Sequence, residues 1–301
     1  MHAVAEQIGY RRNRAGVRLR TGKTQVISLV ISLEEEMLDM TSQIVQGITN
    51  QLTDTAYHLV VTPYTAKQQP IEAVQYVVET GSADGIILSR IERDDARLHY
   101  LSEKNFPFVC HGRSLTGLEH AYHDFDNYRF CHDAIELLAS RGRKTIAALM
   151  PPERFTYHQH AMEGFAAATR KHGLEPFLLP GLSTDSRISE IEQQVETIMR
   201  GDRRPDGLIC LSASSAVAAT CGIENAQLSL GTDIDMVAKN SIDFLPRFRP
   251  AIFAIHENMR RAGENLADAI LAAIDGKPPG SLQSIDYTEG LLQRIASPDP
   301  A

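Results

Sequence analysis

The sequence predicts an α/β protein made of two similar Rossmann-like lobes, each with a parallel β-sheet covered by helices. Three observations predict this fold. The chain has 301 residues, a length typical of about two domains. Apolar runs of strand length alternate with segments of helical apolar spacing. Finally, ADGIILS at 83–89 recurs as PDGLICLS at 205–212, so each half contains the same turn, strand and serine.

The elements of the first half follow from their apolar patterns. QVISLVIS at 25–32 is almost continuously apolar, which is typical of a strand buried on both faces of a parallel sheet. The segment 41–55 has apolar residues at helical spacing, and Thr41 or Ser42 could cap that helix. The other elements expected here are strands at 58–63, 81–89, 106–113 and 121–126, and helices at 71–78, at 97–104 and from 127 to 140.

The second half repeats the alternation. Its expected elements are strands at 143–152, 175–181, 205–212 and 235–239, helices at 156–172, 188–199 and 257–274, and one or two strands within 284–297. Gly173 and the GKPPG segment at 276–280 are helix-ending signals. Because the carboxyl ends of parallel strands share one edge of a sheet, we expect a ligand site between the two lobes.

Composition and charge exclude several classes of protein. With 43% hydrophobic and 23% charged residues the chain is globular, and it contains no apolar run long enough to cross a membrane. The N-terminal segment lacks the apolar core of a signal peptide, so we expect a cytoplasmic protein with reduced cysteines. Residues 1–25 hold six basic residues and one acidic residue, which leaves a charge of −13 on the remainder. This basic arm fits either a nucleic-acid contact or a solvated terminus.

No motif for catalysis or for a cofactor is present. The sequence contains no GxGxxG after a strand, no GxxxxGK[ST], no GxSxG and no HExxH. A metal site built from the histidines at 120, 123, 158 and 160 is possible, but His-x-His spacing without a third ligand nearby favours surface or pocket histidines. We therefore expect a binding protein and not an enzyme, with no catalytic residue, no metal and no cofactor.

The basic arm is followed by a more specific signal. AEQIGYRRNRAGVRLRTGKTQVISLVIS resembles the hinge of LacI/GalR-family transcriptional repressors, although Arg12 stands where that family usually has proline. The matching residues are Ile8–Gly9–Tyr10, Arg12–Asn13, Leu19 and Arg20–Thr21–Gly22–Lys23–Thr24. Further segments match the family in order along the whole chain: CHGR at 110–113, DFDN at 124–127, GTDIDMVAKN at 231–240, FRPAIFAIHENMRRAG at 248–263 and GLLQRIAS at 290–297.

The resemblance implies a type I periplasmic-binding-protein-like fold, with two lobes joined by three crossings and preceded by a short hinge segment. A small effector, usually a sugar, lies between the lobes of this family. The implied domains are a remnant of the DNA-binding domain with the hinge helix at 1–25, a first lobe of 26–142 plus about 252–280, and a second lobe of 143–251 plus about 281–301. The helix-turn-helix of the family precedes the hinge, and residues 3–9 match its last helix.

Two sets of candidate site residues follow from the resemblance. Leu19 matches a minor-groove wedge, and the candidate DNA contacts are Asn13, Arg14, Arg18, Leu19 and Arg20. The candidate effector contacts are Ser32, Ser89, Arg113, Asp126, Tyr157, His160, Ser212 and Asn240. Each of these residues is equally compatible with a strand-end or capping role. Ser212 and Asn240 stand where the family has asparagine and aspartate, which favours a neutral polyol as ligand.

The implied function is an effector-responsive transcriptional repressor. We expect a cytoplasmic homodimer that binds operator DNA and a small carbohydrate-like ligand, with no membrane partner. Ile44, Ile48 and the helix at 71–78 are expected to supply apolar faces for the dimer. The alternative is a sugar solute-binding protein without DNA binding, against which the hinge motif and the lack of a signal peptide argue.

Overall fold

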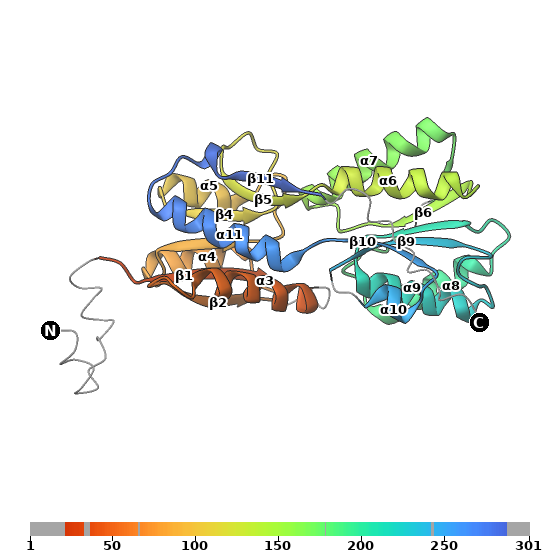
Figure 1. Ribbon diagram of the computed structural model, residues 1–301, viewed down its shortest axis with the longest axis horizontal. Helices are drawn as coiled ribbons and strands as arrows, with labels where there is room; N and C mark the ends of the chain where they lie inside the picture. Colours follow the sequence, from red (N-terminus) through yellow and green to blue (C-terminus); the bar gives the residue numbers. More distant parts are fainter. Residues whose placement is uncertain (1–21, 33–36, 66, 178, 242–243, 288–301) are drawn as a thin grey trace.

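Two parallel sheets, one in each lobe, form the centre of the molecule (Figure 1). The computed structural model describes residues 22–32, 37–65, 67–177, 179–241 and 244–287. The first sheet has the strand order β11-β5-β4-β3-β1-β2 and the second β10-β9-β8-β6-β7, and all paired strands are parallel. This arrangement confirms the predicted fold class.

The strands of the first sheet are β1 (Val26–Ser32), β2 (His58–Tyr64), β3 (Gly85–Leu88), β4 (Phe108–His111), β5 (Ala121–Phe125) and β11 (Gln283–Asp286). Those of the second are β6 (Thr145–Leu149), β7 (Glu175–Phe177), β8 (Gly207–Cys210), β9 (Asp235–Asn240) and β10 (Ile252–His256). The helices are α3 (Met37–Leu52), α4 (Pro70–Glu79), α5 (Ala96–Glu103), α6 (Asn127–Ser140), α7 (Thr156–His172), α8 (Ile188–Met199), α9 (Ala213–Asn225), α10 (Leu245–Phe248) and α11 (Met259–Ile274).

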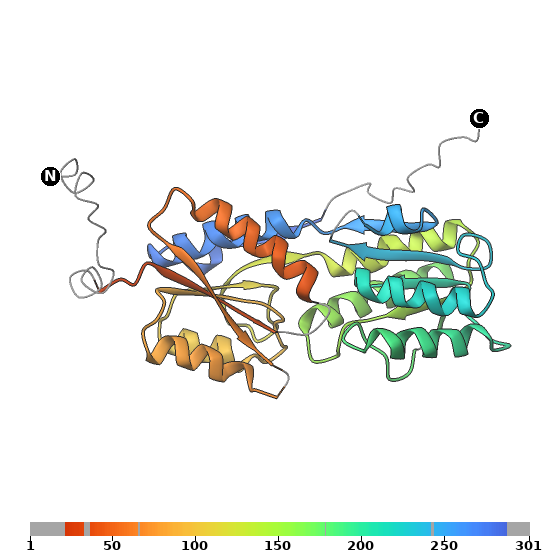
Figure 2. The same ribbon diagram turned by 90° about the horizontal axis from the view of Figure 1, so that it is seen from below.

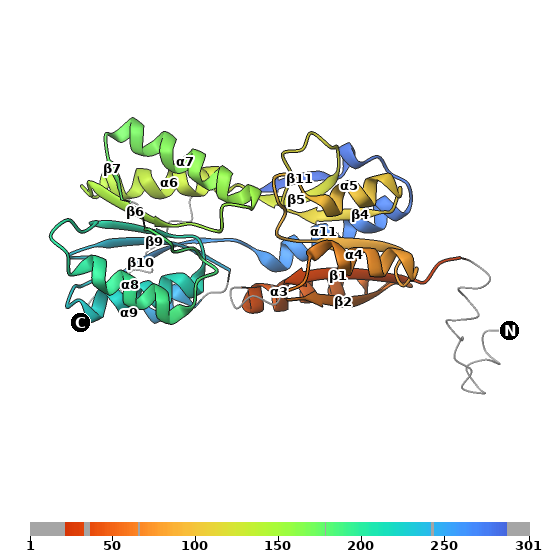
Figure 3. The ribbon, with the colours of Figure 1, turned by 180° about the vertical axis from the view of Figure 1, so that it is seen from behind.

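Helices cover both faces of each sheet, which explains the continuously apolar strands. On β1, Ile27, Leu29 and Ile31 pack against α3 and α11, while Val30 packs against the cluster formed with α4 and α5. Figure 2 shows α3 and α11 side by side on one face of the first sheet. In the second lobe α6 and α7 cover one face of the sheet, and α8 and α9 cover the other (Figure 3). Among the described residues, no helix combines the length and apolar character needed to cross a membrane.

The sequence-based division into lobes is wrong in three places. The segment 252–256, expected in the first lobe, is β10 and pairs with β9 in the second sheet. The segment 281–286, expected in the second lobe, contains β11, which pairs with β5 in the first sheet. Helix α6, also expected in the first lobe, packs on α7 and the second sheet. A strand-like pattern predicts a strand, but it does not show which sheet the strand joins.

Glycines allow α3 and α11 to approach each other closely. A Cβ atom on Gly47 of α3 would overlap the carbonyl oxygen of Arg260, and one on Gly263 of α11 would overlap that of Ile44. The helix backbones therefore pack against each other at both positions without an intervening side chain.

The variant Gly263→Ala is expected to lose about 1–3 kcal/mol of unfolding free energy, since an added methyl must push the two helices apart. Urea denaturation followed by circular dichroism measures the loss. Gly201→Ala is the control, because its Cβ would meet only the oxygen of Ile198 at 3.2 Å. Equal stabilities of the two variants would contradict the close approach.

Candidate functional site

The carboxyl ends of the two sheets face each other across the junction of the lobes. The segment after β3 contacts the segment after β6, because both the backbone N–H and the hydroxyl of Thr156 donate to the carbonyl of Ile91, at 2.9 and 3.0 Å. A second contact joins the two lobes: Gln43 Nε2 of α3 donates to the carbonyl of Ser241, just beyond β9, at 2.8 Å. Ligands of parallel α/β folds bind outside the carboxyl ends of strands, so this junction is the candidate site.

Two buried serines stand at the strand ends of the first lobe. Ser32 ends β1 and Ser89 follows β3, and their exposed fractions are 4% and 3%. Within the described part of the chain the Ser89 hydroxyl has no hydrogen-bond partner. Ser89 lines a small apolar pocket together with Thr41 and His111. An unsatisfied buried hydroxyl beside apolar surface is a group that a polar ligand could satisfy.

The second lobe presents matching polar groups. Asn240 ends β9 and is 2% exposed, and His160 lies on α7 and is 8% exposed. Neither Asn240 Oδ1 nor His160 Nδ1 has a hydrogen-bond partner among the residues that the structure describes. The pKa of His160 is lowered by burial and further by the positive charge of Arg113, so its imidazole is neutral at physiological pH. Both lobes therefore contribute uncharged hydrogen-bonding atoms.

Arg113 and Asp126 approach this site with their own partners. Arg113 Nε lies 3.0 Å from Asp124 Oδ2, and the charges of Arg113 and Asp126 both act on His160. The carboxylate of Asp126 also caps α6, because it accepts a hydrogen bond from the backbone N–H of Arg129 at 3.0 Å. Burial raises the pKa of Asp124 to about 7, although Arg113 opposes that shift.

Ser212 and Tyr157 have structural contacts of their own. Ser212 is the N-cap of α9 and accepts from the backbone N–H of Ser215 at 3.2 Å. The ring of Tyr157 is stacked on Phe155, with centroids 5.4 Å apart. For Ser212 the capping role that the sequence left open is thus present. The hinge candidates Asn13, Arg14, Arg18, Leu19 and Arg20 lie outside the described residues.

A buried charged cluster beside the site was missed by the sequence analysis. Lys239 Nζ lies 2.8 Å from Glu257 Oε2, and His111 Nε2 lies 3.9 Å from Glu257 Oε1. Burial alone would raise the pKa of Glu257, but Lys239 and His111 outweigh it and hold that pKa below its usual range. Glu257 lies on the crossing between β10 and α11, so the cluster links a crossing to β9 and β4. The available signal was a lysine near the end of an apolar strand.

Three of the four histidines considered as metal ligands have other partners. His120 Nε2 accepts from the backbone N–H of Ser114 at 3.1 Å, and His158 Nδ1 lies 2.6 Å from the carbonyl of Pro151. His123 Nδ1 contacts the hydroxyl of Ser284 at 2.9 Å. Over the described ranges, no group of three His, Cys, Asp or Glu side chains is placed to hold a metal ion.

The comparison with protein families agrees with this geometry. The model of the periplasmic binding protein-like domain matches residues 135–291, which is more than half of the chain. The chain belongs to this family. The fold of two parallel sheets is the one that the sequence predicted.

Curated proteins similar in sequence to this chain include transcriptional regulators of the LacI type. The chain is 27% identical to the HTH-type transcriptional regulator AglR of Rhizobium meliloti (strain 1021), with 100% of this chain and 85% of that protein covered. It is also 27% identical to the HTH-type transcriptional regulator RafR of Escherichia coli, with 94% and 84% covered. The resemblance to LacI-family regulators is thereby confirmed, and the chain is a regulator of this type.

A solved structure extends the comparison. The chain superposes on the transcriptional regulator CelR in complex with cellobiose with a TM-score of 0.74 and 19% identity, covering 94% of this chain and 86% of that one. At this identity the likeness demonstrates the shared fold. These relatives are transcriptional regulators and not enzymes.

Asp124 makes stability depend on pH in an unusual direction. Its folded pKa of about 7 lies above the value of about 3.9 for an unfolded aspartate, so the folded chain binds the extra proton between these values. The stability contributed by this group is complete below about pH 4 and is lost as the pH rises to about 7.

Asp124→Asn removes that titration. The unfolding free energy of the variant, relative to the unmodified protein, should therefore rise between about pH 5 and 7, by at most about 1.4 kcal/mol per pH unit. The contribution of His123, whose pKa burial lowers to about 4, is present in both proteins and largely cancels. Urea denaturation over this range tests it, with exposed Asp54→Asn as control. Parallel stability curves for Asp124→Asn and the unmodified protein would show that Asp124 does not titrate there.

Proposed function

We propose that this regulator binds a neutral carbohydrate between its lobes and represses transcription at operator DNA. The ligand class is inferred from which polar groups at the junction already have partners and which do not. Arg113 lies 3.0 Å from Asp124, and Lys239 lies 2.8 Å from Glu257, so each of these cations already has a carboxyl group beside it. The unpartnered buried atoms of the described residues include Ser89 Oγ and Asn240 Oδ1 at strand ends and His160 Nδ1 on α7.

Neutral donors and acceptors on facing strand ends suit a ligand rich in hydroxyl groups. Each hydroxyl donates and accepts, so a sugar could satisfy a serine, an amide oxygen and an imidazole together. The cellobiose complex of CelR supports this class, since that regulator has the same fold and its ligand is a disaccharide. Ser32, Arg113, Asp126, Tyr157 and Ser212 are proposed as further contacts around the same ligand.

Effector binding acts on DNA through the positions of the lobes in this proposal. A ligand that contacts both lobes stabilises the arrangement in which they lie together, and the crossings transmit the change to the hinge. Leu19 is proposed as the minor-groove wedge, with Asn13, Arg14, Arg18 and Arg20 near phosphates. We place the protein in the cytoplasm and assign it no catalysis. The alternative, a solute-binding protein, predicts sugar binding without any effect on operator binding.

The effector site is tested by thermal unfolding with a panel of neutral mono- and disaccharides. A ligand that binds only the folded state stabilises it by about 2.7 kcal/mol at one hundred times its dissociation constant, so the melting temperature should rise. Asn240→Ala and Ser89→Ala should each abolish or strongly reduce that rise, because their side chains face the ligand.

Asn225→Ala is the matched control for Asn240→Ala, since Asn225 is exposed and bonds Glu192 Oε1 at 3.0 Å, away from the site. Its shift should equal that of the unmodified protein. Asp126→Asn is informative because asparagine keeps the cap of α6, whereas alanine removes it. A response to purines or amino acids in place of sugars would overturn the carbohydrate assignment.

A homodimer is the proposed assembly, and its proposed surface keeps the expected helix at 71–78 but not Ile44 and Ile48. Ile44 and Ile48 are 4% and 0% exposed and pack inside the first lobe, so they are not available to a partner. The exposed apolar side chains of that lobe include Val60 and Val61 on the edge strand β2, at 47% and 40%, and Tyr76 on α4, at 65%. An exposed apolar patch at a sheet edge is a typical site of association.

Light scattering at micromolar concentration should give the mass of a dimer. The double variant Val60→Glu with Tyr76→Glu should shift it toward the monomer, because it places charges in the apolar contact. Ile188→Glu changes a similarly exposed apolar residue of the second lobe, at 48% exposure, and should leave the dimer intact. A monomeric mass for the unmodified chain would refute the dimer.

A further inference from the structure

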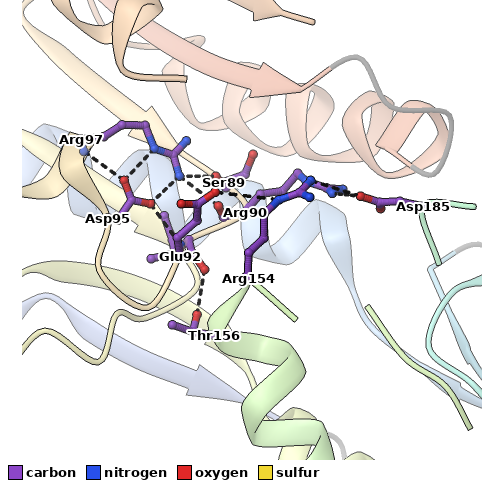
Figure 4. Close-up of polar contacts among 9 residues, drawn as sticks. Ser89, Arg90, Glu92, Asp95, Arg97, Arg154, Thr156 and Asp185 are labelled. Carbon is purple, nitrogen blue, oxygen red and sulfur yellow. Dashed lines mark hydrogen bonds and ion pairs between the residues drawn. The ribbon is translucent and has the colours of Figure 1, made fainter. Parts of the chain in front are cut away.

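The two lobes also meet along a short seam that is remote in sequence from the crossings. On the first lobe the seam is the turn Ser89–Glu92 after β3, and on the second it is Arg154–Thr156 at the start of α7 (Figure 4). The backbone of Glu92 forms an antiparallel bridge with that of Phe155, next to the hydrogen bonds from Thr156 to Ile91. The lobes are thus in direct contact here as well as at the crossings.

Charged side chains cross the seam in both directions. Arg90 of the first lobe is 5% exposed and pairs with Asp185 of the second lobe, which lies between β7 and α8 (Figure 4). Arg154 of the second lobe lies 3.8 Å from Glu92 of the first and 3.6 Å from Asp185. Each lobe contributes one arginine and one carboxylate, so the Arg90–Asp185 and Arg154–Glu92 pairs are separated when the lobes separate, whereas Arg154 and Asp185 lie in the same lobe.

An aromatic ring from the second lobe completes the contact. The guanidinium carbon of Arg90 lies 4.3 Å from the centroid of the Phe155 ring, and that of Arg154 lies 4.4 Å from the same centroid. Phe155 is 3% exposed. A cation over an aromatic ring is attracted more strongly when both are shielded from water, so the contact favours the closed arrangement.

A buried ion pair inside the first lobe holds the turn that carries Arg90. Arg97 Nη2 donates to the carbonyls of Ser89 and Arg90, at 3.2 and 2.9 Å, and Arg97 is bonded twice to Asp95, at 2.6 and 2.9 Å. Asp95 in turn accepts from the backbone N–H of Glu92 at 3.1 Å. Arg90 has a φ of +55°, in the left-handed region that side chains rarely adopt, so the turn needs such support.

We propose that Arg90 and Asp185 form a latch that sets the equilibrium between open and closed lobes, and that the Asp95–Arg97 pair positions it. Separation of the lobes breaks the Arg90–Asp185 pair and returns both charges to water. Loss of either partner removes this attraction between the lobes, so closure is disfavoured. Without Arg90, Asp185 keeps, within the described part of the chain, only the ion pair with Arg154 of its own lobe, at 3.6 Å. The consequence for effector affinity rests on the proposed function: a lower closed fraction raises the apparent Kd in proportion.

The latch is tested by the distance between the lobes, which needs no effector. Fluorescent labels at Asp54→Cys and Arg203→Cys, both exposed, report that distance by energy transfer in a Cys221→Ser background diluted with unlabelled chain. Arg90→Gln and Asp185→Asn should each shift the population toward longer distances. The exchanged pair Arg90→Asp with Asp185→Arg should restore part of the closed population, since aspartate tolerates a left-handed φ.

Arg249→Gln is the matched control. Arg249 also stacks on a phenylalanine, Phe248, at 4.3 Å, and it also pairs with a carboxylate, Glu224, at 2.8 Å, but all three residues lie in the second lobe. This variant should leave the interlobe distance unchanged. Circular dichroism of every variant identifies any that fail to fold. If Arg90→Gln fails to fold, Asp185→Asn tests the same ion pair from its other member.

Arg97 is tested through its coupling to Arg90. If it acts by positioning the latch, Arg97→Gln opens the lobes, and Arg90→Gln with Arg97→Gln opens them no further than Arg90→Gln alone. Additive opening would overturn the positioning role. Unchanged distances in both Arg90→Gln and Asp185→Asn would overturn the latch itself.

The effector measurement separates this proposal from the proposed function. The latch variants should weaken the apparent affinity for a bound sugar by about tenfold, within the usual range of coupling between sites. Opening of the variants, together with no sugar binding by any protein, would leave the latch supported and the carbohydrate effector refuted. If the latch variants bind sugar like the unmodified protein and show the same interlobe distance, the latch alone is refuted.

Discussion

Each lobe buries both faces of a parallel sheet, and this burial restricts where polar chemistry can be placed. Apolar side chains fill the space between strands and helices, so β1 has almost no position for a charged group. Polar side chains gather where the strands end. Since the carboxyl ends of both sheets face the junction of the lobes, serine, asparagine, histidine and charged residues from distant segments come together there.

The cations Arg113 and Lys239 at this junction each lie beside a carboxyl group of the protein itself. A buried charge without a partner is costly, and here Lys239 faces Glu257 while Arg113 faces Asp124. The two pairs lie near different crossings, because Glu257 follows β10 and Asp124 lies near the end of β5. Neutral polar atoms beside them, such as Asn240 Oδ1, have no hydrogen-bond partner among the described residues. The proposed ligand contacts therefore lie next to the crossings.

The seam around Arg90 adds a second set of contacts between the lobes. Ser89, a candidate ligand contact, and Arg90, the proposed latch, are adjacent on one turn, and Arg97 bonds the carbonyls of both. A movement of this turn would affect the ligand site and the interlobe ion pair together. That adjacency offers a direct physical connection between occupancy of the site and closure of the lobes.

The sequence by itself determined the α/β class, the two lobes and most strands, because burial on two faces demands continuous apolar runs that are visible in one dimension. It also placed Ser89 and Asn240 at the ends of strands, since Ser89 follows such a run and Asn240 ends one. Only the tertiary structure decided that 252–256 joins the second sheet and 281–286 the first, because the pattern of a strand does not show which sheet it joins. Likewise, the partners of Lys239 and Arg90 are 18 and 95 residues away, at Glu257 and Asp185. Such pairings depend on how two lobes pack, and no local pattern records that.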